Sequence, residues 1–179
     1  MNIMKRLHIH TIHRTRLSVF INILLLVLAF LIQTSIFPLI PFLSATPNLL
    51  LILCFSLSFI HGSFQGMFYG LFTGILVDLF YSGPFGFYAL IYLLIGYLNG
   101  MFSRFFYEEY LVIPMVLCLF SEIIYHLYIY LFRFLIRLRF DVGYYFVHIV
   151  FPSIVFSLLV TLLVYRIYYS LVRRVEKRL

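Results

Sequence analysis

Three ionisable side chains share one face of a strongly apolar stretch in the second half of the chain. Glu122 and His126 are four residues apart, and Arg133 lies eleven residues after Glu122, close to a whole number of helical turns. A carboxylate, an imidazole and a guanidinium in this order can form a proton relay, an ion pair or a groove that binds a partner. Arg133 can also extend to the outer lipid headgroups. Structural pairing of Glu122 with His126 or with a neighbouring helix explains the pattern equally well, so both interpretations stay open.

A regular series of small or polar residues runs through the apolar stretch that ends near residue 80. Small residues let helix backbones approach closely in lipid, where the hydrophobic effect does not drive helix association. Residues four apart form one inclined ridge, which suits a crossed partner helix, and Gly96 and Gly100 give the next stretch a matching patch. Static packing is the simpler interpretation, and a sliding or hinge surface is the functional one. The series consists of Gly62, Gly66, Gly70, Gly74, Asp78 and Ser82.

Asp78 is the one carboxylate in this series, near the outer end of its helix. A carboxylate inside a membrane is costly unless it is paired, near water or bound by backbone N–H groups. A helix C-terminus also disfavours negative charge. The turn Ser82-Gly83-Pro84 follows directly and can supply donors, so we expect Asp78 to anchor this loop rather than to carry protons.

No other residues form a recognisable catalytic or metal-binding pattern. Cys54 and Cys118 are far apart within apolar runs, which is typical of small buried hydrophobic residues. The chain has no phosphate-binding loop, nucleophile elbow or HExxH motif, and its loops are too short for a soluble active site. We therefore expect a binding or scaffold protein without catalysis, metal or cofactor. The N-terminal histidines His8, His10 and His13 lack a carboxylate or cysteine to complete a site.

The composition is that of an integral membrane protein. Of 179 residues 64% are apolar and only 11% are charged, whereas soluble domains carry about 25% charged residues. A membrane-spanning helix needs about 20 mostly apolar residues, and prolines at 38, 41 and 47 separate the first such run from the second. The sequence therefore predicts an all-α protein with a six-helix transmembrane bundle. The expected spans are 17–37, 48–60, 64–80, 85–102, 110–132 and 144–164.

The distribution of basic residues predicts the orientation. Six spans place both termini on one side together with ten of the thirteen Lys and Arg residues, and leave Arg133, Arg137 and Arg139 outside. Merging the second and third spans would divide the basic residues seven to six, which fits the positive-inside rule less well. We expect both termini in the cytoplasm. Interfacial tyrosines are expected at 81, 144 and 145 outside and at 107, 110, 168 and 169 inside.

The net charge of +7 is concentrated at the two ends of the chain. The ends form a basic arm (1–16) and a basic tail (165–179) around a transmembrane domain (17–164). Because these clusters flank spans, we expect them to bind anionic lipids and not nucleic acid. The first apolar run has no small-residue cleavage site after it, so we interpret it as a retained span.

Several segments together resemble the rod shape-determining protein MreD family of bacteria. They are Pro47-Asn48-Leu49-Leu50-Leu51-Ile52, Gly70-Leu71-Phe72-Thr73-Gly74-Ile75-Leu76-Val77-Asp78, Gly83-Pro84-Phe85-Gly86-Phe87-Tyr88-Ala89-Leu90 and Leu93-Leu94-Ile95-Gly96-Tyr97. The resemblance extends over nearly the whole chain in length and span order. The chain departs from the family in its high aromatic content and its long basic N-terminal arm.

The resemblance implies a non-enzymatic subunit of the machinery for lateral cell-wall elongation in the bacterial cytoplasmic membrane. The implied partners are the bitopic protein MreC, the filament MreB and the glycan polymerase with its penicillin-binding protein. The family is also similar in fold to the substrate-binding subunits of energy-coupling-factor vitamin transporters, which supplies an alternative function. Co-purification with MreC would favour the first function, and a bound vitamin the second.

Overall fold

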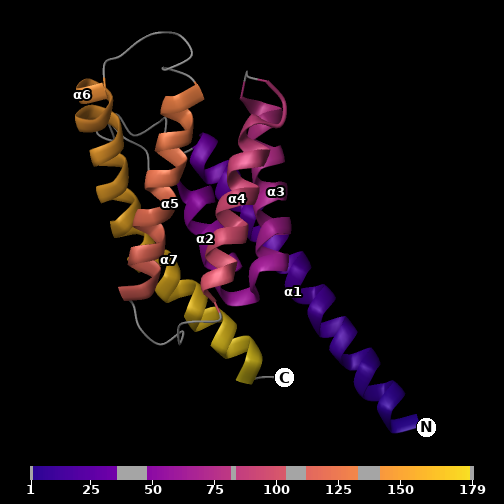
Figure 1. The fold of residues 1–179 in the computed structure, drawn as a ribbon. Helices are drawn as coiled ribbons and strands as arrows, with labels where there is room; N and C mark the ends of the chain where they lie inside the picture. Colours follow the sequence, from indigo (N-terminus) through magenta and orange to yellow (C-terminus); the bar gives the residue numbers. More distant parts are fainter. Residues whose placement is uncertain (1, 36–47, 82–83, 104–111, 133–141, 178–179) are drawn as a thin grey trace.

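The computed structural model describes residues 2–35, 48–81, 84–103, 112–132 and 142–177, with side chains from Ser18 to Val164 within these ranges except at Val112 and Val142, and also at Arg166. All regular structure in these ranges is helical (Figure 1). The helices are α1 (Asn2–Ser35), α2 (Leu49–His61), α3 (Ser63–Phe80), α4 (Phe87–Phe102), α5 (Val112–Tyr130), α6 (Val142–Tyr145), a π-helical turn η3 (Phe146–Val150) and α7 (Phe151–Lys177).

Within the described ranges, four helical segments are long and apolar enough to cross a membrane. They are Ser18–Ser35, Ser63–Phe80, Ile113–Tyr130 and Gly143–Val164. The prediction of an all-α membrane protein is confirmed, and each expected span contains a helix. The ends differ from the expected ones by a few residues, except that α1 and α7 continue well into the basic arm and tail.

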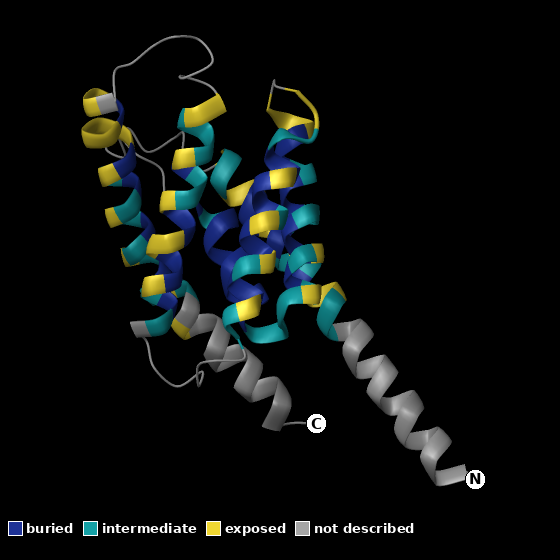
Figure 2. Cartoon of the chain, viewed as in Figure 1, coloured by how far each residue is buried: buried dark blue, intermediate teal, exposed yellow. Residues whose placement is uncertain are grey.

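Of the two shorter apolar helices, α2 lies inside the bundle, whereas α4 also has exposed positions such as Leu90 and Tyr97. With 13 and 16 residues the two helices are about 20 and 24 Å long, less than the roughly 30 Å of a bilayer core. Every residue of α2 from Leu50 to Phe59 is buried (Figure 2). A helix that is apolar on all sides belongs in the interior of a bundle, so α2 forms the centre of the molecule.

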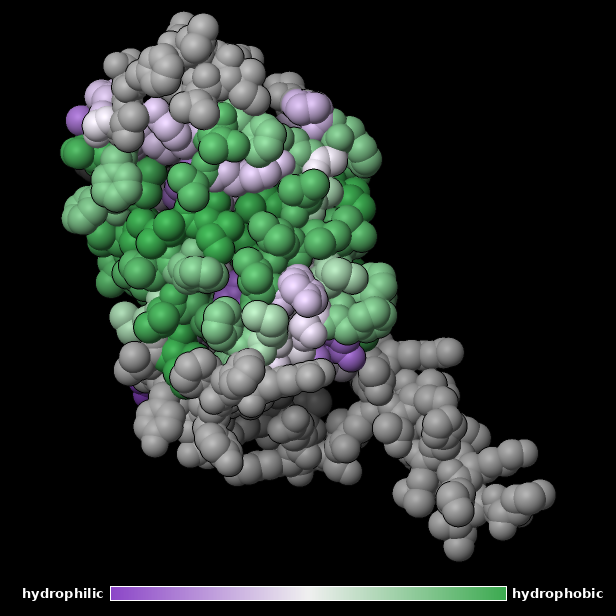
Figure 3. Space-filling model, in the orientation of Figure 1, coloured by the Kyte–Doolittle hydropathy of each residue, from purple (hydrophilic) through white to green (hydrophobic). Residues whose placement is uncertain are grey.

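The outer surface of the bundle is suited to lipid. On the face seen in Figure 3, a broad band of apolar residues crosses the middle of the bundle, and polar residues lie toward its two ends. On α5, for example, Val116, Ile123 and Leu127 are exposed while Glu122 is buried. This is the reverse of a soluble protein, in which exposed positions are mainly polar.

The junction between α2 and α3 is a corner of one residue. Gly62 has φ +89°, a conformation that favours glycine, and Ser63 already begins α3. The predicted break at His61-Gly62-Ser63 is therefore present, and the two short spans are separate helices. Both ends of the chain lie at the same end of the bundle (Figure 1), as an even number of crossings requires.

The last helix contains one wide turn for a clear reason. Pro152 lies at the second position of α7 and has no N–H to donate to the carbonyl of His148. In the preceding turn the Phe151 N–H bonds to Phe146 O, five residues back. The π-helical geometry thus lets α6, η3 and α7 continue as one helix past the proline.

Candidate functional site

The glycine series of α3 lies against α4. A Cβ atom at Gly70 would overlap the Tyr92 carbonyl, and one at Gly74 would overlap the backbone of Ala89. From the other helix, Gly96 lies on the Gly66 carbonyl. Backbone therefore contacts backbone, and α3 with α4 forms the most extensive helix–helix contact among the described residues. Only glycine permits this approach.

The helix backbones also approach closely where α4 ends, beside the start of α3. Gly100 lies against Gly62 and Ser63 at the α2–α3 corner, and Gly66 also touches Ser58 on α2. The glycines at 66, 70, 74, 96 and 100 are thus buried against the chain's own helices, and Gly62 at the corner is partly exposed. A partner helix cannot use this ridge while α3 and α4 stay together.

Asp78 caps the first turn of α4. Its Oδ1 accepts a hydrogen bond from the Tyr88 N–H at 2.8 Å, and its Oδ2 accepts from Gly86 at 3.0 Å and from Ala89 at 2.9 Å. Free N–H groups and the positive end of the helix dipole make this position favourable for an anion. Gly86 has φ +97°, a left-handed conformation that turns the chain into α4.

The donors that the structure describes for Asp78 lie later in the sequence than the turn expected to supply them. They belong to Gly86, Tyr88 and Ala89, whereas Ser82 and Gly83 lie outside the described residues. The sequence showed that a loop anchor was needed, but spacing could not show which N–H groups the carboxylate meets after the chain has turned.

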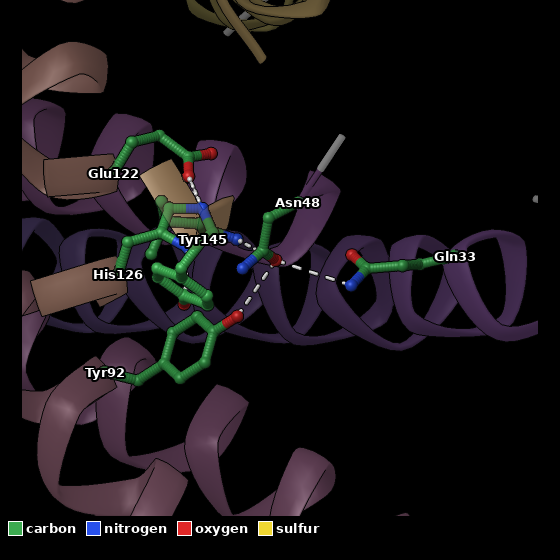
Figure 4. Close-up of polar contacts among 7 residues, drawn as sticks. Gln33, Asn48, Tyr92, Glu122, His126 and Tyr145 are labelled. Carbon is green, nitrogen blue, oxygen red and sulfur yellow. Dashed lines mark hydrogen bonds and ion pairs between the residues drawn. The ribbon is translucent and has the colours of Figure 1, made fainter. Parts of the chain in front are cut away.

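Glu122 and His126 lie together inside the bundle. The Glu122 side chain is fully buried and His126 is 8% exposed. Glu122 Oε2 is 3.3 Å from His126 Nε2, within ion-pair range but without the alignment of a hydrogen bond. His126 Nδ1 is 3.3 Å from the Tyr145 hydroxyl. Figure 4 shows the carboxyl group pointing toward the imidazole. Arg133, the third member of the predicted stripe, lies outside the described residues.

Small polar groups continue this seam between α5 and its neighbours. Asn99 on α4 donates to Ser121 Oγ at 2.8 Å, and Thr161 on α7 contacts Cys118 Sγ at 3.1 Å. The contact between Thr161 and Cys118 sets the register of the antiparallel helices α5 and α7. Glu122 lies one turn after Cys118, and Ser157 lies one turn before Thr161, so Ser157 is level with Glu122. Buried side-chain atoms without a hydrogen bond in the described residues include both Glu122 oxygens, Asn99 Oδ1 and Ser157 Oγ.

Two further polar clusters were not predicted from the sequence. Asn48 caps α2 by accepting from Leu51 N–H, and the same oxygen accepts from the Tyr92 hydroxyl at 2.9 Å and from Gln33 Nε2 at 3.4 Å (Figure 4). Gln33 in turn accepts from the Leu50 N–H at 3.0 Å. An amide inside an apolar run was the available signal, because such a group needs a partner in lipid.

The second cluster joins α1 to the α2–α3 corner. Asn22 Nδ2 donates to the Tyr69 hydroxyl at 3.1 Å and lies 3.3 Å from His61 Nε2. The His61 ring also bonds to the Leu57 carbonyl at 3.0 Å. Asn22 is buried, so this contact gives α1 a specific polar attachment in addition to its apolar packing.

The remaining candidates have simple surroundings. Cys54 and Cys118 are buried free thiols, as expected. Tyr144 is exposed and stacks on His148. Tyr145 is an exception to the predicted interfacial tyrosines, because it is buried and turned toward His126. No group of metal-binding side chains occurs in the part of the chain that the structure describes.

Most of the chain matches the sequence model of a known protein family. The family model described as rod shape-determining protein MreD matches residues 13–175. The chain belongs to the MreD family. No curated protein and no solved structure matches it. The similarity in fold between MreD proteins and vitamin-transporter subunits therefore stays a prediction.

In this MreD chain, the residues that carried the resemblance have structural tasks. Asn48 opens α2, Gly70 and Gly74 bring α3 onto α4, and Asp78 with Gly86 sets the start of α4. The family motif thus describes how the α2–α4 core is built. The chain is a rod shape-determining membrane protein by family, and its surface for partners must be sought elsewhere than on the glycine ridge.

Proposed function

We propose that this chain is a non-enzymatic scaffold of the bacterial cell-wall elongation machinery that maintains rod shape by binding MreC. Through MreC or directly, it would hold MreB and the glycan polymerase with its penicillin-binding protein at one place in the membrane. The observation that carries the proposal is the family match over residues 13–175. The arrangement of side chains supports it, since most of the described polar groups hold helices to one another.

The structure also limits where a partner helix can bind. The glycine ridge and the Glu122–His126 pair are enclosed, so MreC would contact outward-facing positions. On α5 these include Ile123 and Leu127, which are 46% and 61% exposed. Lipid-facing apolar side chains pack against a partner helix by van der Waals contact.

We further propose that both termini are cytoplasmic and that the basic arm and tail bind anionic headgroups. The two ends of the chain share one end of the bundle (Figure 1), and both carry clusters of Lys and Arg. Such clusters favour the cytoplasmic side and attract anionic lipid.

Depletion and crosslinking in a rod-shaped host test the function. Cells depleted of the protein should become round and swollen. A photo-crosslinking residue at Ile123 or Leu127 should capture MreC, while one at the buried neighbour Leu117 should not. Cells that keep their rod shape but lose the uptake of one vitamin would instead indicate the transporter-subunit function.

A further inference from the structure

The two described carboxyl groups of the membrane domain have opposite surroundings. Asp78 accepts three backbone N–H bonds at a helix N-terminus, an environment that stabilises a negative charge. Glu122 is fully buried, and neither of its oxygens accepts a hydrogen bond within the described part of the chain. An isolated charge without such bonds is very costly in a medium of low dielectric constant. Glu122 therefore needs neutralisation from a nearby group.

The described side chains of the elements packed against α5 place no compensating charge beside Glu122; Arg166 on α7 is exposed and lies nine residues beyond Ser157. These elements are α2, α4 and α7, with Tyr145 of α6 on the His126 ring. No Lys or Arg is among the side chains described between Ser18 and Val164. The titratable groups around the pair are thiols and phenols, which are uncharged at neutral pH. They are Cys54 on α2, Tyr92 on α4, Cys118 and Tyr125 on α5, and Tyr145 on α6.

His126 is thus the one described base beside Glu122, at 3.3 Å. If the two side chains share a single proton, their total charge is zero, whichever of them carries it. Without that proton the pair has a net charge of −1, and with a second proton it has +1. Either net charge would be buried among apolar side chains, which disfavours both.

We propose that Glu122 and His126 form a proton-binding site in the membrane interior that holds one proton in common. Tyr145 of α6 contacts the His126 ring, and Ser157 of α7 lies level with Glu122. Both side chains of the pair are buried, so we expect water to reach them only when α5 separates from α6 and α7. The proton is therefore exchanged with solvent when this seam opens, and the neutral pair keeps the seam closed.

Spectroscopy of the full-length protein in lipid nanodiscs locates the proton. Infrared spectra distinguish a carboxylic acid from a carboxylate by the carbonyl stretch, and nitrogen-15 NMR distinguishes an imidazolium from a neutral imidazole. At neutral pH we expect one proton for the pair. It should appear either as a buried carboxylic acid signal that Glu122→Gln removes, or as an imidazolium signal that His126→Gln removes.

The controls are a glutamate and a histidine outside the pair. Glu176→Gln, in the basic tail, should leave the carboxylic acid signal unchanged, and His148→Gln, at an exposed ring, should leave any buried imidazolium signal unchanged. A carboxylate at Glu122 beside a neutral His126, or a pair with two protons, overturns the proposal.

Variants that fail to fold do not prevent the test. In wild-type protein labelled at glutamate and histidine, one proton should be found on the buried pair at neutral pH and should exchange slowly with solvent. Fast exchange with solvent at every glutamate and histidine would contradict the proposal. Because these measurements do not depend on cell shape or MreC, their outcome is independent of the proposed scaffold function.

Discussion

At the scale of single residues, the polar side chains of the membrane domain serve mainly as caps and clamps between helices. Asp78, Asn48 and Gln33 all bind backbone N–H groups at the start of a helix. Helix starts leave several N–H groups without intrahelical partners, and lipid cannot supply acceptors for them. A short helix that begins inside the bundle therefore needs acceptor side chains from its neighbours.

Asp78→Ala should destabilise the protein strongly. The substitution leaves the N–H groups of Gly86, Tyr88 and Ala89 without their acceptor, and loss of charge-assisted bonds at buried donors costs about 2 kcal/mol or more. A clear fall in the midpoint of thermal unfolding in detergent is the expected result. Leu79→Ala is the control, because Leu79 is exposed toward lipid. Equal midpoints for the two variants would show that the cap contributes little.

Tyr92→Phe should have a smaller effect of the same kind. It removes the hydroxyl that donates to Asn48 at 2.9 Å but keeps the ring, so the expected loss is about 1 kcal/mol of unfolding free energy. Tyr97→Phe on the same helix, at a position 44% exposed, should change the unfolding midpoint less. The difference between the two variants measures how much the Tyr92 hydroxyl in the Gln33–Asn48–Tyr92 cluster contributes to the free energy of unfolding. A larger effect at Tyr97 would contradict the assignment.

Residue types alone predicted some of these roles and missed others. Asp78 stood out because a carboxylate in an apolar run needs a partner, yet its donors lie in a turn whose path the sequence does not show. Gln33 gave only the general signal of an amide inside an apolar run, and Tyr92 gave none, because their partner Asn48 is distant in sequence and the contact exists only after α1 and α4 pack around α2. Pairwise contacts of this kind depend on tertiary structure.

At the scale of helices, the spacing of glycines carries the most information. An interval of four residues predicts a ridge that admits a close neighbour, and the structure places α4 on it. The sequence could not identify α4 as the neighbour, since a ridge only specifies a face. Likewise, the face shared by Glu122 and His126 was predicted correctly, but whether it points to lipid, a partner or the chain's own core depends on the packing of α6 and α7.

Substitutions of glycine by alanine should separate the close helix contact from open positions. Gly70→Ala should reduce the yield and the unfolding midpoint, because the methyl group would overlap the Tyr92 carbonyl; overpacking of this kind costs about 1–3 kcal/mol. Gly143→Ala, where no atom lies within 4 Å of the added Cβ, should be neutral or slightly stabilising. Gly70→Leu should abolish folding, and Leu71→Ile beside it should be tolerated. Equal tolerance at Gly70 and Gly143 would mean that α3 and α4 do not pack as described.

At the scale of the whole molecule, the chain divides into a tight part and a looser part. The helices α2, α3 and α4 share the closest contacts, and α1 is attached to them at Asn22 and Gln33. The α5–α7 part meets this core through fewer contacts, and its seam contains most of the buried polar atoms that lack hydrogen bonds in the described ranges. Any rearrangement within the bundle is therefore expected at this seam, because it has the least packing to lose.

The orientation of the chain in the membrane can be tested by labelling single cysteines. The ends of α1 and α7 lie at one end of the bundle (Figure 1), beyond the spanning segments Ser18–Ser35 and Gly143–Val164. Their basic sequences should keep this end in the cytoplasm. In a background that lacks Cys54 and Cys118, a membrane-impermeant thiol reagent added to intact cells should label single cysteines at Ser44 and Val142. Cysteines at His10 and Glu176 should react only after the membrane is opened. Labelling of position 176 in intact cells would show that the tail is outside, and the basic clusters would then need a different explanation from the positive-inside rule.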